Sequence, residues 1–133
     1  MKYLFDTDIC VFLIKRKFPA LLEKFRRLPA GDMGLSVITV FEMQYGAHRS
    51  RFQEQNARTL QLFLAPLTIL PFEEEDAKVG GAIRADLEAA GNPIGPFDLL
   101  IAAQAIRNGL TVVTNNMREF GRVKGLQVEN WAA

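Results

Sequence analysis

The chain has 133 residues, of which 49% are hydrophobic and 23% are charged, and its 16 basic and 15 acidic residues leave a net charge of +1. This length supports one hydrophobic core, so we expect a single domain over residues 1–133, and the apolar content excludes an intrinsically disordered chain. One Cys and one His exclude a disulfide framework and a zinc cluster of these residues, which indicates a reducing compartment.

The apolar runs are too short for a targeting or membrane segment. Only three apolar residues stand between Lys2 and Asp6, fewer than the core of a signal peptide needs. No later run approaches the roughly 18 apolar residues of a membrane span. We therefore expect a cytoplasmic protein that does not enter the membrane.

Short apolar runs alternate with helical patterns along the first half of the chain. Residues 3–5 predict a strand that ends at Asp6, and residues 9–14 predict a helix. Pro19 begins a second helix that ends near Arg27. The next expected elements are a strand over 33–35, a helix over 37–48 capped by Ser36, and a helix over 52–64.

The second half continues the same alternation. The expected elements are a strand over 67–70, an acidic-started helix over 73–91, a helix over 96–108, a strand over 111–114 and a strand near 126–128. Gly80 and Gly81 inside the acidic-started helix indicate close packing. Short apolar strands separated by helices are typical of a parallel sheet covered on both faces, so we expect an α/β sandwich.

Acidic and amide side chains follow two of these strands. They are Asp6 and Asp8 after the first strand, and Asn115, Asn116 and Glu119 after the strand over 111–114. Ligands of parallel sheets bind beyond the carboxyl ends of the strands, so these residues are candidates for a site. A second interpretation is that Asp8 caps the helix that starts at Ile9 and that the others are turn residues.

Glu42 stands inside an apolar row of the helix over 37–48. Its neighbours on that row include Ile38, Phe41 and Tyr45, so the pattern predicts a glutamate that faces the core. An unpaired buried carboxylate is costly and calls for a proton or a cation. The alternative is that Glu42 lies at the edge of the row and reaches water.

Asp98 repeats this pattern in the first turn of its helix. Its row continues with Ile101, Ala102 and Ala105, which are all apolar. An acid in the first turn also interacts favourably with the helix dipole, which is the simpler explanation. The dipole does not explain why the acid occupies the inward face.

These acids would repel one another if they converged at one sheet edge, and a cation would have to offset that repulsion. The set is Asp6, Glu42 and Asp98, with Asp8 and Glu119 beside them. No Lys or Arg is adjacent in sequence to Asp6, Asp8, Glu42 or Asp98. Because every candidate ligand is an oxygen donor, Mg²⁺ or Mn²⁺ is favoured over zinc. The predicted chemistry is in-line attack of a metal-activated water on a phosphoester.

Four segments carry a family resemblance in their order and spacing. They read LFDTD at 4–8, SVITVFEMQYGA at 36–47, IGPFDLLIAA at 94–103 and LTVVTNNMREF at 110–120. Together they resemble the VapC toxins, which are PIN-domain ribonucleases of type II toxin–antitoxin systems. The resemblance implies a PIN-like α/β/α sandwich with a central parallel sheet of about five strands, a homodimer, inhibition by a VapB-type antitoxin, and cleavage of RNA with Mg²⁺ or Mn²⁺.

The resemblance also implies roles for individual residues. The metal-binding acids of the family fall on Asp6 and Asp98, and its helix glutamate falls on Glu42. Many PIN domains carry an aspartate at the position of Asn116, and Glu119 is the candidate replacement, with Asp8 and Asn115 as supporting residues. The pattern Asn-Asn-x-x-Glu-Phe is similar to that of enteric toxins that cut initiator tRNA in its anticodon loop, which makes this tRNA the expected substrate.

Basic residues gather in the first half of the chain and are candidates for contacts with RNA phosphates. They are Lys15, Arg16, Lys17, Lys24, Arg26 and Arg27, followed by His48, Arg49 and Arg51. Taken alone, these clusters are better explained as a solvated helix face, because Lys and Arg are mostly exposed in any case. Because His48 is the single histidine, RNA cleavage by two imidazoles is excluded.

Three other functions fit parts of the sequence. The spacing Asp6-x-Asp8 resembles the start of a haloacid dehalogenase phosphatase, but Cys10 stands where that motif has Thr or Val. A receiver-type module needs an aspartate after its third strand, where this chain has Pro71. Asn116 fits a PIN-like module that binds RNA or a partner without cutting.

Overall fold

Five short strands form one parallel sheet in the computed structural model, which describes residues 1–132. The strands are β1 (Tyr3–Phe5), β2 (Met33–Ser36), β3 (Thr68–Leu70), β4 (Thr111–Val113) and β5 (Gln127–Glu129). Their order across the sheet is β3-β2-β1-β4-β5, and all four neighbouring pairs are parallel. The predicted parallel sheet of about five strands is confirmed, with β1 at its centre.

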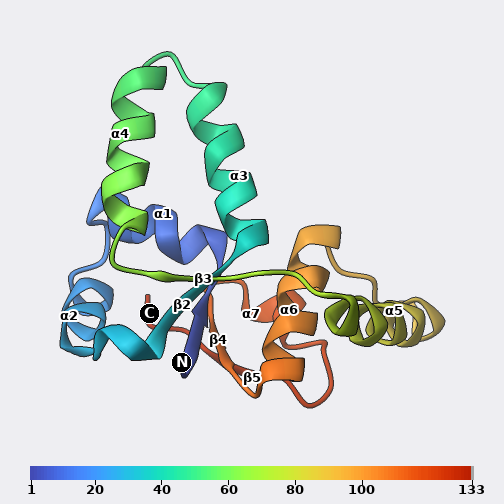
Figure 1. The fold of residues 1–133 in the computed structure, drawn as a ribbon. Helices are drawn as coiled ribbons and strands as arrows, with labels where there is room; N and C mark the ends of the chain where they lie inside the picture. Colours follow the sequence, from blue (N-terminus) through green and yellow to red (C-terminus); the bar gives the residue numbers. More distant parts are fainter. Residues whose placement is uncertain (133) are drawn as a thin grey trace.

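Helices separate the strands along the chain and cover both faces of the sheet (Figure 1). They are α1 (Thr7–Lys15), α2 (Pro19–Arg27), the short 3₁₀ helix η1 (Ala30–Asp32), α3 (Val37–His48), α4 (Gln53–Leu64), α5 (Glu74–Ala89), α6 (Pro96–Asn108) and α7 (Met117–Phe120). Figure 1 shows α3 and α4 as a pair that stands away from the sheet, with α5 and α6 on the other side. No helix within residues 1–132 combines the length and the apolar character that crossing a bilayer requires.

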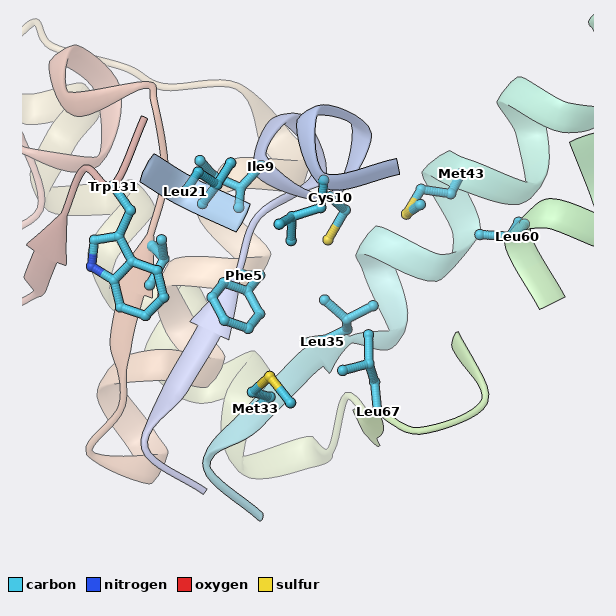
Figure 2. Close-up of a cluster of buried hydrophobic side chains, with 12 residues drawn as sticks. Phe5, Ile9, Cys10, Leu21, Met33, Leu35, Met43, Leu60, Leu67 and Trp131 are labelled. Atoms are coloured by element: carbon cyan, nitrogen blue, oxygen red, sulfur yellow. The ribbon is translucent and has the colours of Figure 1, made fainter. Parts of the chain in front are cut away.

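Each face of the sheet has its own apolar core. Successive residues of a strand point to opposite faces, and the fully buried Leu4 and Phe5 accordingly belong to different clusters. The cluster around Phe5 joins the sheet to α1, α2, α3 and α4, and Figure 2 shows Trp131 and Cys10 within it. The cluster around Leu4 joins the sheet to α5 and α6.

Two short elements lie outside the sequence predictions. They are η1 and α7, which have three and four residues and are therefore too short for a helical period. Asn116 caps α7 by accepting a hydrogen bond from the backbone N–H of Glu119. The remaining helices and strands agree with the expected ranges to within one or two residues.

The two adjacent glycines of α5 differ in their surroundings. A Cβ at Gly80 would lie 3.4 Å from Cβ of Ala103 on α6, whereas a Cβ at Gly81 would meet nothing within 4 Å. The predicted close packing is therefore confirmed for Gly80 and is wrong for Gly81.

This difference predicts opposite effects of substitution. Gly81→Ala should raise the free energy of unfolding by about 1 kcal/mol, because alanine has the higher helix propensity and space is open. Gly80→Leu should lower it by about 1–3 kcal/mol, because the larger side chain pushes α5 from α6. Urea denaturation of the two variants measures both changes, and equal effects would contradict the packing described.

Candidate active site

The site lies at the carboxyl ends of β1 and β4. Asp6 directly follows β1, and Asn116 and Glu119 follow β4. Asp98 comes from the first turn of α6, and Glu42 comes from the middle of α3. Four elements far apart in the sequence therefore contribute side chains to one edge of the sheet.

Asp6 is held rigidly and is only 3% exposed. Its Oδ1 accepts a hydrogen bond from the backbone N–H of Ile9 at 2.9 Å, and its Oδ2 accepts one from the Thr114 hydroxyl. Burial outweighs these bonds and raises the pKa of Asp6 from 3.8 to about 7, with smaller contributions from the negative charges of Asp8 and Glu42. Asp6 is also the N-cap of α1. The interpretation that Asp8 caps this helix is wrong, because the helix begins at Thr7, two residues before Ile9.

Asp98, Asn116 and Glu119 form a connected group. The Asn116 side-chain amide donates to Oε2 of Glu119 at 3.0 Å and to Oδ2 of Asp98 at 3.4 Å. The backbone N–H of Gly95 donates to Oε1 of Glu119 at 3.0 Å. The structure thus brings Glu119 beside Asp98, as the sequence predicts.

A proton belongs to Asp98 in this group. Burial, then the hydrogen bond and charge of Glu119, and then the charges of Asp6 and Glu42 raise the pKa of Asp98 to about 8. The pKa of Glu119 is lowered, chiefly by the hydrogen bond from Asp98 and also by those from Gly95 and Asn116. Near neutral pH, Asp98 therefore donates a hydrogen bond to an ionised Glu119.

Glu42 lies at the edge of the buried face of α3. Its Oε1 accepts a hydrogen bond from the Thr7 hydroxyl at 2.6 Å, and its charge contributes to the raised pKa of both Asp6 and Asp98. The row on which the sequence places Glu42 is largely solvent-facing, since Phe41 is 58% exposed and Tyr45 is 59% exposed.

The prediction of a core-facing Glu42 is therefore wrong, and the alternative that it reaches the surface is correct. The residues of α3 that face the core are Thr39, Met43 and Ala47. Because α3 carries apolar residues on nearly all sides, the sequence pattern does not distinguish its buried face from its exposed face.

Two candidates lie away from the central group. Asp8 is exposed and acts on Asp6 only through its charge. Asn115 is exposed, and its Oδ1 accepts a hydrogen bond from Asn130 at 3.3 Å. Two hydroxyls that the sequence predictions omit, those of Thr7 and Thr114, hold Glu42 and Asp6 instead. No local sequence signal reveals these two contacts, because Glu42 and Asp6 lie 35 and 108 residues from their hydroxyl partners.

The chemistry of this donor set fits a hard divalent cation. All of its charged groups are carboxylates, and no ion pair within residues 1–132 involves Asp6, Glu42, Asp98 or Glu119. Burial first, and then the negative charges of neighbouring acids, raise the pKa of Asp6 and of Asp98. In the described part of the chain, no three Asp, Glu, His or Cys side chains are already gathered closely enough to hold one ion. The predicted ligand set Asp6, Glu42 and Asp98 thus stays a prediction.

Comparison with known proteins identifies the class of this fold and site. Residues 3–126 match the PIN domain family, whose nucleases generally depend on a divalent metal ion. The chain is 42% identical to the tRNA(fMet)-specific endonuclease VapC of Shigella flexneri, with 99% of each chain covered. It is 44% identical to ribonuclease VapC2 of Haemophilus influenzae, with 98% of each covered.

Solved structures support the same family assignment. A DNA-bound VapBC complex from Salmonella typhimurium is similar with a TM-score of 0.93 and 40% identity over 98% of each chain. VapBC-1 from nontypeable Haemophilus influenzae is similar with a TM-score of 0.91 and 31% identity over 100% of each chain. The chain belongs to the PIN-domain family and, within it, to the VapC ribonucleases. This membership removes the phosphatase and receiver alternatives.

The raised pKa values predict that stability of the metal-free protein depends on pH. An Asp6 carboxyl with a pKa of 3.8 when unfolded and about 7 when folded stabilises the fold fully below about pH 4 and loses that effect by about pH 7. We expect the free energy of unfolding to fall over this range by about 4 kcal/mol at most. Urea denaturation at a series of pH values measures it.

Asp6→Asn should flatten this profile, because the amide does not ionise and still caps a helix. Asp8→Asn is the matched control and should change the slope little, since Asp8 is exposed. If the free energy of unfolding of the metal-free protein changes with pH by the same slope before and after Asp6→Asn, the raised pKa assigned to Asp6 is contradicted.

Proposed function

We propose that this VapC ribonuclease is an Mg²⁺- or Mn²⁺-dependent toxin that hydrolyses a phosphodiester in the anticodon loop of initiator tRNA. The observation that carries the proposal is the group of Asp6, Glu42, Asp98 and Glu119 at one sheet edge, which has no ion pair with a basic side chain in the described residues 1–132. The substrate is supported by full-length identity of 40–42% to two tRNA(fMet)-specific endonucleases. The expected location is the cytoplasm, where this substrate is found.

Asp6 and Asp98 would hold the metal ion, with Glu42 beside it. The bound ion would activate the attacking water and stabilise negative charge on the phosphate. Thr114 and the N–H of Ile9 orient Asp6 for this task, and Thr7 orients Glu42. The other role of these acids is to hold and release protons.

Asp98 must release its proton before it can bind a cation as a carboxylate. Its pKa of about 8 means that metal ions and protons compete for this oxygen near neutral pH. Asn116 and Gly95 keep the ionised Glu119 in place beside Asp98, where its hydrogen bond and charge would retain the Asp98 proton until that proton leaves to water.

The partner that we propose is a VapB-type antitoxin, because the similar solved structures are VapBC complexes. A largely apolar groove of about 350 Å³ runs between α1, α3 and α4. Thr7, Glu42 and Leu60 are among the residues that line this groove. An apolar antitoxin segment seated here would reach Glu42 and block the site. The homodimer implied by the resemblance stays a prediction.

Substitution of the site acids tests the nuclease activity. Asp98→Asn should reduce RNA cleavage at least about 100-fold, because it removes a metal ligand, while the circular dichroism spectrum stays that of the native protein. Asp32→Asn is the control, since Asp32 precedes β2 at the opposite edge of the sheet. Retained cleavage by Asp98→Asn would favour a different catalytic group, and no cleavage by the native protein would favour the binding-only alternative.

The choice of substrate has its own test. Purified protein with Mn²⁺ should cut initiator tRNA once, in the anticodon loop, and leave elongator tRNAs intact. Primer extension across a mixture of cellular tRNAs locates the cut. Cleavage spread over many tRNAs would contradict the proposed substrate while preserving the nuclease.

A further inference from the structure

A buried polar contact and an aromatic contact both link the α3 segment to α6. Ser36 ends β2, caps α3 and donates its hydroxyl proton to Oε1 of Gln104 on α6. Both of these side chains are fully buried. Towards the other end, the rings of Phe41 and Phe97 pack edge to face with their centroids 5.6 Å apart. These two contacts define how α3 lies along α6.

The acids of the site are placed by these same helices. Glu42 follows Phe41 in sequence, and Asp98 follows Phe97. Glu42 is six residues from Ser36, and Asp98 is six residues from Gln104. Six residues span about 9 Å along a helix axis. Because the two helices run in opposite directions, any slide of α6 along α3 changes the separation of Glu42 and Asp98 directly.

Gln104 also resists such a slide by its other hydrogen bonds. Its Nε2 donates to the backbone carbonyl of Leu70 at 3.1 Å and to that of Pro71 at 3.0 Å. Leu70 is paired with Ser36 in the sheet, and Pro71 follows Leu70. The hydrogen-bond partners of the Gln104 side chain therefore all lie together at the carboxyl ends of β2 and β3. A displaced α6 would leave two carbonyls and a hydroxyl unpaired in the interior, which is strongly disfavoured. A purely apolar contact would impose no such requirement.

We propose that Gln104 is a positioning residue of the nuclease site. Its hydrogen bonds to Ser36, Leu70 and Pro71 set the register of α6 against α3, and this register sets the spacing of Asp98 from Glu42. Gln104 is fully buried and therefore acts through α6 and not on the RNA. The inference rests on the proposed function, because spacing of these acids matters for an ion that they share.

Gln104→Leu tests this role, and Asp76→Asn is its matched control. Asp76 is also fully buried and accepts a hydrogen bond from Arg107 of α6, but it joins α6 to α5. Both variants should lose thermal stability. At a temperature where both are folded, Gln104→Leu should lower kcat about tenfold or more with KM for the tRNA unchanged, since small misplacements of catalytic groups are costly. Asp76→Asn should keep the native kcat.

Calorimetric titration with Mn²⁺ alone gives a measurement that does not depend on cleavage. The dissociation constant should rise several-fold in Gln104→Leu and stay native in Asp76→Asn. Ser36→Ala removes the Ser36–Gln104 hydrogen bond by deleting its donor. The loss of kcat in the double variant should therefore be smaller than the product of the losses in Ser36→Ala and Gln104→Leu.

Native kcat and Mn²⁺ affinity in Gln104→Leu, or losses that multiply in the double variant, would overturn the positioning role. If Gln104→Leu does not fold, Ser36→Ala decides by the same two measurements. Failure of the native protein to cut RNA would refute the proposed function instead, and the Mn²⁺ titrations would still test the spacing.

Discussion

Repulsion among acids at the carboxyl end of the sheet is the constraint on which this molecule depends. Asp6, Glu42 and Asp98 come from three elements, and burial, together with the charges of neighbouring acids, raises the pKa of Asp6 and of Asp98. Within residues 1–132 no basic side chain pairs with the three acids. The metal-free chain tolerates this closeness because protons bind the acids and because hydroxyl and amide donors hold them. Two apolar cores, one on each face of the sheet, supply the stability that keeps the acids together. A divalent cation at this edge would convert a destabilising arrangement into a functional one.

Asn116 changes how charge is distributed within this group. An aspartate at its position would add a carboxylate next to Asp98 and Glu119, which already share a proton. The amide instead donates to both carboxyls and caps α7. Glu119 therefore brings a carboxylate to the group from one helical turn further on, at a lower electrostatic cost than two adjacent ionised acids would carry.

Much of the fold follows from local patterns in the sequence. The helices over 19–27 and 96–108 begin at prolines, and the strand over 111–113 is a β-branched run, so period and punctuation suffice to predict them. Asp98 was predictable as an acid in the first turn of its helix, and the structure leaves it partly buried at the start of a helix whose residues 101–105 are all buried. The face of α3 was not predictable, since apolar residues surround it. Asp6 and Asp8 are both good caps, and only the three-dimensional structure decides between them.

Residues that act across long sequence separations had no local signal. Thr7, Thr114 and Gln104 stand in or beside apolar runs. The groups with which they hold the site and its helices lie at least 32 residues away, although the Thr114 hydroxyl also accepts a local bond from the N–H of Asn116. A polar residue in such a run is compatible with solvent exposure, with a cap or with a distant hydrogen bond. The hydrogen bonds that hold the site acids and their helices in place could therefore be identified only from the structure.

The position of Cys10 has a consequence for the redox behaviour of the protein. This is the single cysteine of the sequence, it is fully buried beside the site, and burial together with the charge of Asp6 raises the pKa of its thiol. A thiol that stays protonated and out of solvent is a poor nucleophile. Oxidants and alkylating reagents therefore leave this sulfur unmodified in the native fold and reach it only when the first helix opens. Cys10 is thus a natural reporter of that opening.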